Sequence, residues 1–226
     1  MQEFLIKIIP NVMKDLNILG KSIIETLQMT GQAGLISFVL GMIFGTALVV
    51  SRKGGILQNL VLYQILDKLI NIIRSVPFII LLFSLLPLTR LISGTALGVR
   101  GAIVPLVFGT TPFFARQIEA ALSGVDEGLI EAAQSMGNSN REIIFRVYWK
   151  ESIAAIARGT SITLINLVGL TAMAGAVGAG GLGNFAYIYG QQRNHPDDIY
   201  VTVVILVLLV MVIQLIGNCV VRRNTH

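Results

Sequence analysis

The chain has few charged residues for its size. Of its 226 residues, 17 are Lys or Arg and 12 are Asp or Glu, so only 13% are charged, about half the fraction found in a typical soluble domain. Because 54% of the residues are hydrophobic, these charges could not cover the surface of a water-soluble protein. We therefore interpret the chain as an integral membrane protein, a single domain over residues 1–226 with lipid as its solvent.

Cysteine and histidine are also scarce. The single cysteine, Cys219, cannot form an internal disulfide, and we interpret it as a buried small apolar residue. His195 and His226 lie far apart with no cysteine near either, so we predict no metal site and no catalytic triad. The sequence also has no G-x-x-x-x-G-K-[ST] phosphate-binding loop. These absences predict a protein with no catalytic residue of its own and no cofactor.

Charges divide the chain into apolar runs. A helix rises about 1.5 Å per residue and needs about 20 residues to cross the hydrocarbon core. We predict an all-α integral membrane protein with five membrane-spanning helices and one long cytoplasmic loop, at about 123–152. The five spans are predicted at about 26–50, 69–89, 101–119, 159–174 and 199–221.

The second span has two further expected features. Pro77 and Pro87 lie near its two ends, where they predict kinks. The apolar segment before it, residues 54–66, is too short to cross, so we expect it along the membrane surface or packed on the helix bundle.

The distribution of Lys and Arg predicts the orientation. Five spans place the two termini on opposite sides; one side then holds 11 basic residues and the other holds six. Because basic residues gather on the cytoplasmic side, we expect a multi-pass protein of the cytoplasmic membrane with its N-terminus outside and its C-terminus inside. The net charge of +5 is read as an orientation signal, so no nucleic-acid partner is predicted.

Several charged residues fall near the predicted span ends, and we interpret them as snorkelling to the interface. Arg116 and Glu119, at i and i+3, are expected to pair. No acidic residue or histidine is expected deep inside a span, which argues against a proton-coupled carrier. The residues interpreted in this way are Arg74, Arg90, Arg100, Arg116 and Glu119.

The segment Glu131–Ser152 is polar, although the chain around it is apolar. Gly137 predicts the end of a first helix, and Ser139 with Glu142 predicts a capping box that begins a second. The expected apolar face of the first helix is Val125, Leu129, Ile130, Ala133 and Met136; that of the second is Ile143, Ile144, Val147 and Tyr148.

Two interpretations of this loop are open. It could rest on the membrane-spanning helices as a solvated loop. Alternatively, it could be a docking element for a cytoplasmic partner, which the small residues Ala132, Ala133 and Gly137 would allow to approach closely.

The stretch EAAQSMG resembles the EAA loop of the membrane subunits of ATP-binding-cassette importers. The positions that match are Glu131, Ala132, Ala133 and Gly137. The resemblance implies that a short helix here sits in a cleft of an ATPase subunit. The family pattern continues with a Leu-Pro pair, whereas this chain has Val147, Trp149 and Lys150.

Five segments in order are similar to the methionine-uptake permeases within that family. The resemblance implies a homodimer, each copy engaging one ATP-binding-cassette ATPase subunit inside, with an extracytoplasmic methionine-binding protein delivering L- or D-methionine. ATP would be hydrolysed by the ATPase, and the permease would work by alternating access. A secondary transporter, or an importer permease for another small amino acid, stays open as an alternative. The segments are NIIRSVPFIILL, AIVPL, PFFAR, GLIEAAQSMG and AMAGAVGAGGLG.

The glycine-rich stretch after the fourth span predicts a break near Gly175 to Gly183, because glycine allows sharp turns and close backbone contact. Non-helical backbone at membrane depth is tolerated only where protein buries it or where it lines a cavity. The break could serve close packing of the fourth and fifth spans, or an outer gate. Met173, at its start, is the candidate gate residue.

Overall fold

The computed structural model describes residues 9–224, and within this range the chain is helical and forms no strand. His226 lies outside the described residues. The chain divides into two compact units. Unit 1 consists of Met1–Leu35, Pro77–Phe108 and Leu164–Ile213, and unit 2 of Ile36–Val76, Gly109–Thr163 and Gln214–His226.

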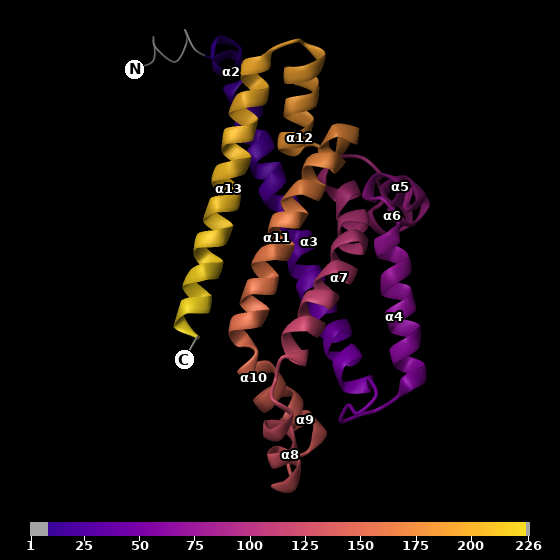
Figure 1. Cartoon of the computed structure of the whole chain (residues 1–226). Helices are drawn as coiled ribbons and strands as arrows, with labels where there is room; N and C mark the ends of the chain where they lie inside the picture. The colour runs from indigo at the N-terminus through magenta and orange to yellow at the C-terminus, as the bar shows by residue number, and fades with distance from the viewer. Residues whose placement is uncertain (1–8, 225–226) are drawn as a thin grey trace. The chain divides into compact units, whose positions relative to one another are not determined.

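The described helices are shown in Figure 1 with the labels used from here on. Seven of the described α-helices have fewer than ten residues, and three segments, η1 to η3, have the wider π-helical turn. In chain order they are α2 (Pro10–Lys14), α3 (Leu16–Ser51), α4 (Leu60–Ser75), α5 (Phe78–Ser84), α6 (Leu86–Ser93), α7 (Gly98–Ser123), α8 (Glu127–Ser135), α9 (Asn140–Glu142), η1 (Ile143–Tyr148), α10 (Trp149–Glu151), α11 (Ile153–Ala174), η2 (Gly175–Ala179), α12 (Gly181–Phe185), η3 (Ala186–Gln192) and α13 (Pro196–Arg223).

Four of the described helices are long and apolar enough to cross a membrane. They contain the first, third, fourth and fifth predicted spans, each within a somewhat longer helix. Their bounds are Leu16–Ser51, Gly98–Ser123, Ile153–Ala179 and Pro196–Arg223.

The second predicted span, 69–89, is divided among α4, α5 and α6, so no single described helix covers it. Helix α4 ends at Ser75, and Val76 is extended, with φ −84° and ψ 124°. Proline disfavours helical backbone in the residue before it and lacks the N–H that would continue the ladder. The break at Pro77 is therefore confirmed, while Pro87 lies in the first turn of α6, where proline is tolerated.

Each unit has its own apolar core. In unit 1, α3, α5, α7, α11 and η2 bury one cluster. Helices α2, α3 and α12 bury another, and partly buried residues of η3 and α13 pack against it. In unit 2, the C-terminal part of α3 packs with α7 and with the helices from α8 to η1, and a smaller cluster joins α3, α4 and α7. The most deeply buried large side chains are Met29, Leu106, Leu167, Leu182 and Phe185 in unit 1, and Leu48, Phe114, Ile118, Leu122 and Ile143 in unit 2.

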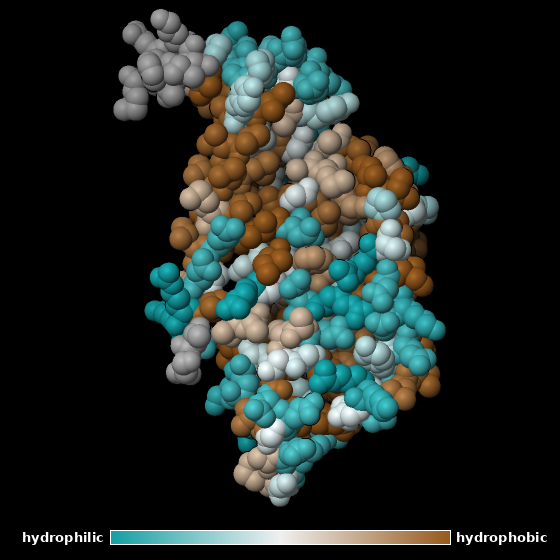
Figure 2. Space-filling view, viewed as in Figure 1, coloured by the Kyte–Doolittle hydropathy of each residue, from teal (hydrophilic) through white to brown (hydrophobic). Residues whose placement is uncertain are grey.

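Helix α13 keeps most of its apolar side chains exposed. Only 6% of its most apolar 18-residue stretch is buried, although the mean hydropathy of that stretch is 3.0. Figure 2 shows hydrophobic side chains along the part of α13 in unit 1. Such a surface is stable only against lipid or another apolar partner. Cys219 is exposed on this helix, so its predicted burial is wrong: the side chains around it face outward too.

Candidate functional site

The first helix of the polar loop, α8, is closed at both ends by its own residues. The carboxylate of Asp126 accepts a hydrogen bond of 2.7 Å from the backbone N–H of Gly128. At the other end the N–H of Asn138 donates to the carbonyl of Ala133, and that of Gly137 to Gln134, which is a Schellman turn. Gly137 has φ +78°, a conformation that other residues adopt only with strain. The prediction that Gly137 ends this helix is confirmed.

The second helix begins as predicted. Ser139 and Glu142 form a complete capping box, in which the N–H of Ser139 donates to the Glu142 carboxylate at 2.9 Å. This hydrogen bond and that of the Ser139 hydroxyl hold the pKa of Glu142 below its ordinary value. From Asn140 to Glu151 the backbone remains helical, through α9, η1 and α10. Figure 1 shows these short helices together at one end of unit 2.

The two helices bury only part of the faces predicted from spacing. Ile130, Ile143 and Tyr148 are buried in unit 2, at 9%, 0% and 3% exposure. Leu129 is 47% exposed, however, and Met136 is 75% exposed. Ile130 and Ala133 lie on the buried face of α8, whereas Leu129 and Met136, seven positions apart, share an exposed face and form an apolar surface.

The four residues that match the EAA pattern do not share one role. Glu131, Ala132 and Gly137 are exposed. Ala133 is only 2% exposed and belongs to the core of unit 2. The expectation that Ala133 leaves room for a partner is therefore wrong. It leaves room for its own chain, since a larger side chain would overfill this core.

Trp149 anchors the second helix, and the sequence alone did not single it out. Its indole N–H donates a 3.0 Å hydrogen bond to the hydroxyl of Thr46 on α3. Phe145 packs edge-on against it, with ring centroids 4.7 Å apart. Near the end of the loop the Ser152 hydroxyl donates to the carbonyl of Ala121 on α7, at 3.1 Å. In this chain the segment that lacks the Leu-Pro pair is thus fixed to α3 and α7.

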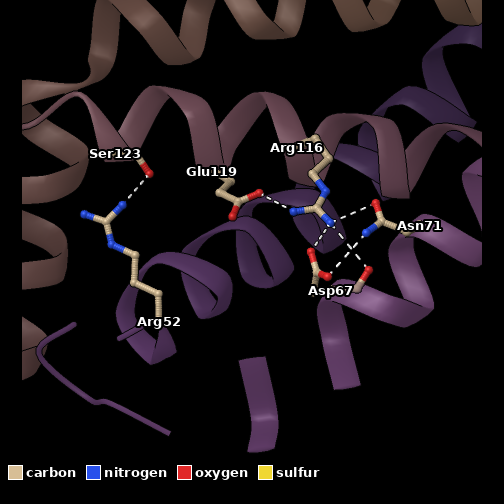
Figure 3. Close-up of polar contacts among 6 residues, drawn as sticks. All are labelled: Arg52, Asp67, Asn71, Arg116, Glu119 and Ser123. Carbon is tan, nitrogen blue, oxygen red and sulfur yellow. Dashed lines mark hydrogen bonds and ion pairs between the residues drawn. The ribbon is translucent and has the colours of Figure 1, made fainter. Parts of the chain in front are cut away.

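A polar network joins α4 to α7 within unit 2 (Figure 3). The guanidinium group of Arg116 donates to the carboxylate of Asp67, to Glu119 at 2.6 Å and to the side-chain oxygen of Asn71 at 2.9 Å. The pairing of Arg116 with Glu119 is confirmed. The interpretation of Arg116 as a snorkelling residue is wrong: its side chain is 19% exposed and carries the network.

A second polar contact lies further along α7. Arg52, just after α3, donates to the hydroxyl of Ser123 at 3.0 Å. Figure 3 shows Ser123 beyond Glu119 on the same helix, with Arg52 reaching it from another part of the chain. Two side chains thus hold the end of α7 that leads into the polar loop: Arg52 bonds Ser123, and Ser152 bonds the carbonyl of Ala121.

The predicted break after the fourth span is confirmed. Val177 and Gly178 leave the helical conformation inside η2. Gly178, Gly180 and Gly181 have φ values of +98°, +84° and +76°. The chain then begins a new short helix, α12. Met173 lies on α11 just before this break and is 44% exposed.

The comparisons with known proteins agree with these features. Residues 37–225 match the family described as the inner membrane component of binding-protein-dependent transport systems. The chain is 47% identical over 202 residues to the probable D-methionine transport system permease protein MetI of Vibrio cholerae, covering 89% of this chain and 90% of that protein. It is 44% identical to the methionine import system permease protein MetP of Bacillus subtilis, covering 94% and 95%.

Two solved structures share the fold. A chain of the MetNI methionine ABC transporter, described as inward facing, matches with a TM-score of 0.92 and 43% identity, over 94% of this chain and 99% of that one. A chain of an amino acid ABC transporter matches with a TM-score of 0.77 at 19% identity, covering 95% and 98%. This second likeness concerns the fold alone. The protein described here therefore belongs to the family of binding-protein-dependent transport system inner membrane components, as an all-helical, multi-pass protein of the inner membrane.

Proposed function

We propose that this chain is the membrane-spanning permease subunit of an ATP-driven methionine importer and works by alternating access. The observation that supports this most strongly is an exposed helical loop fixed to α3 and α7 by hydrogen bonds. The chain that carries this loop matches methionine permeases over most of its length. The chain itself would hydrolyse nothing. An ATP-binding-cassette ATPase subunit inside and a methionine-binding protein outside would be its partners, and a second copy would complete the pathway.

The coupling loop, residues 123–152, would carry the movement of the ATPase into the membrane. Its outward surface offers the ATPase an apolar contact at Leu129 and Met136 and small or charged groups at Glu131, Ala132 and Gly137. Because the Trp149 and Ser152 contacts fix the loop to α3 and α7, a displacement of α8 would move those helices too. Energetic coupling needs such packed, rigid connections.

In this proposal α4, α5 and α6 together make the second of five crossings, and this crossing is broken at Pro77. The N-terminus would lie outside and the C-terminus inside, because this places 11 of the 17 basic residues in the cytoplasm. Alkaline phosphatase, which works only after export, should then be inactive when fused after Asn224. Its activity in that fusion would contradict the orientation.

Met173 is the candidate gate. If α11 lines the axis between two copies, the exposed thioether of Met173 from each copy would narrow the path. Met173→Ala should then increase the leak of methionine from liposomes without ATP, by about threefold to tenfold, since truncation removes three heavy atoms from a constriction. Val177→Ala, at a residue 37% exposed within the same break, is the matched control. An unchanged leak in Met173→Ala would rule out this role.

The proposal as a whole is tested by uptake in cells. A strain that lacks this chain should take up radiolabelled methionine more slowly than its parent, and a plasmid copy should restore the rate. Competition by unlabelled L-methionine, D-methionine and other small amino acids separates the substrates. If uptake of another amino acid falls in place of methionine, the importer assignment stands and the substrate assignment fails.

A further inference from the structure

Side chains of α3 cap the N-terminus of helix α12. The backbone N–H of Gly181 donates a 2.7 Å hydrogen bond to the carboxylate of Glu25. The next N–H, that of Leu182, donates a 2.8 Å bond to the hydroxyl of Thr26. The first N–H groups of a helix need acceptors from outside it, and the residue before α12, Gly180, has no side chain to supply one. Two adjacent residues of α3, 156 positions away, supply both.

The glycines at this contact allow the approach. A Cβ atom at Gly180 would lie 2.5 Å from a carboxylate oxygen of Glu25, and one at Gly181 would lie 2.7 Å from the Thr26 hydroxyl oxygen. Both glycines also have positive φ. A larger residue at either position would strain the backbone and displace the Glu25 carboxylate or the Thr26 hydroxyl, which would break the contact.

Glu25 is the only charged residue between Lys21 and Arg52. Its side chain is 22% exposed, and Lys21 lies 3.7 Å away with a side chain that is 77% exposed. Glu25 lies on α3 one residue before the predicted first span, 26–50, and an acidic group so close to the lipid usually has a functional reason. Here the carboxylate meets the positive end of α12, where a negative charge is stabilised.

Helix α12 also packs against α11 next to Met173, the candidate gate residue. Gly183 of α12 lies so close to α11 that a Cβ atom there would collide with the backbone of Ala172. Ala172 precedes Met173. Within unit 1, α3 thus holds α12, and α12 packs against the residue before the candidate gate.

We propose that Glu25 and Thr26 are positioning residues for transport, forming a latch that holds α12 and the glycine-rich break in the arrangement that closes the outer side. The inference rests on the proposed function. The backbone matches a transporter chain described as inward facing, and in alternating access the outer side is closed in that state. The latch would open whenever the outer side opens.

Hydrogen exchange measured by mass spectrometry tests the latch on the full complex in lipid nanodiscs. Glu25→Ala and Thr26→Val each remove one acceptor, so peptides covering residues 178–185 should exchange about tenfold faster or more. Glu25→Gln and Thr26→Ser keep an acceptor, and they should stay within about threefold of the unmodified protein. Unchanged exchange in both Glu25→Ala and Thr26→Val would overturn the proposal.

The same variants are then tested in liposomes with ATP. Methionine taken up per ATP hydrolysed should fall about fivefold in Glu25→Ala and Thr26→Val, a typical allosteric coupling, and Glu25→Gln and Thr26→Ser should restore it. A purely structural role would reduce uptake and hydrolysis together, leaving this ratio unchanged, which would also overturn the proposal. Failure of the proposed function is separate: the unmodified complex would then take up no methionine, whatever its exchange.

Discussion

Replacing Met136 by glutamate is expected to weaken binding of the ATPase subunit by about 100-fold or more. Met136 is 75% exposed and stands immediately before Gly137, at the outward end of α8. A large apolar residue in this position can act as a binding hot spot, and a carboxylate that enters the partner's cleft without a counter-charge must lose its hydration. Because the side chain hardly touches its own chain, the fold should not change.

The matched control is Leu57→Glu. Leu57 is 48% exposed and lies in the turn between α3 and α4, outside the coupling loop. It should leave ATPase binding within about twofold of the unmodified chain, as surface changes away from an interface usually do. Binding is measured by titrating purified ATPase onto nanodiscs that carry each variant. Equal affinities for Met136→Glu and the unmodified chain would show that the ATPase docks elsewhere.

Ala133→Leu should behave differently, although it changes the neighbouring EAA position. It places three extra carbon atoms in the core of unit 2, where Ala133 is 2% exposed, and should destabilise the fold by about 1–3 kcal/mol. The loss of ATPase binding in this variant would thus follow a loss of folded protein. The comparison separates a docking residue from a packing residue within one short helix.

The second large effect is expected from Arg116→Met. Arg116 bridges the carboxylates of Asp67 and Glu119, whose side chains are 31% and 20% exposed. Removing the cation leaves two partly buried carboxylates without a counter-charge, which should cost about 2–4 kcal/mol of unfolding free energy. The melting temperature in detergent should fall by about 5 °C or more.

A rescue design makes this prediction specific. In the triple variant Arg116→Met, Asp67→Asn, Glu119→Gln no charge is left, so most of the lost stability should return. Arg52→Met is the control for removing an arginine, since Arg52 makes an exposed hydrogen bond to Ser123 and should contribute under about 1 kcal/mol. If Arg116→Met melts at the temperature of Arg52→Met, the network does not hold α4 to α7.

Local sequence patterns predicted the features that depend on nearby residues. The ends of α8 and α9 follow from Gly137 and from the pair Ser139 and Glu142, and the break after α11 follows from the density of glycine. The four long helices follow from uninterrupted apolar runs. In each case the determining residues lie within a few positions of the feature, so one-dimensional spacing contains the information.

What spacing could not show are contacts between distant parts of the chain. Asp67 lies 49 positions from Arg116, and Glu25 lies 156 from Gly181. Nothing in the spacing of charges distinguishes a bridging arginine from a snorkelling one. Ala133 and Cys219 show the same limit for apolar residues, because burial depends on which neighbours happen to cover a given face. The kink at Pro77 was predicted, but spacing did not show that the apolar run 69–89 would be divided among three helices.

The most direct test of the whole account measures transport by defined components. The purified chain, a cognate ATP-binding-cassette ATPase and a methionine-binding protein are reconstituted in liposomes, and methionine accumulation is followed with ATP, without ATP and with imposed ion gradients. We predict accumulation against a gradient that requires ATP and all three proteins, and none by the chain alone. Accumulation driven by an ion gradient through the chain alone would contradict the account.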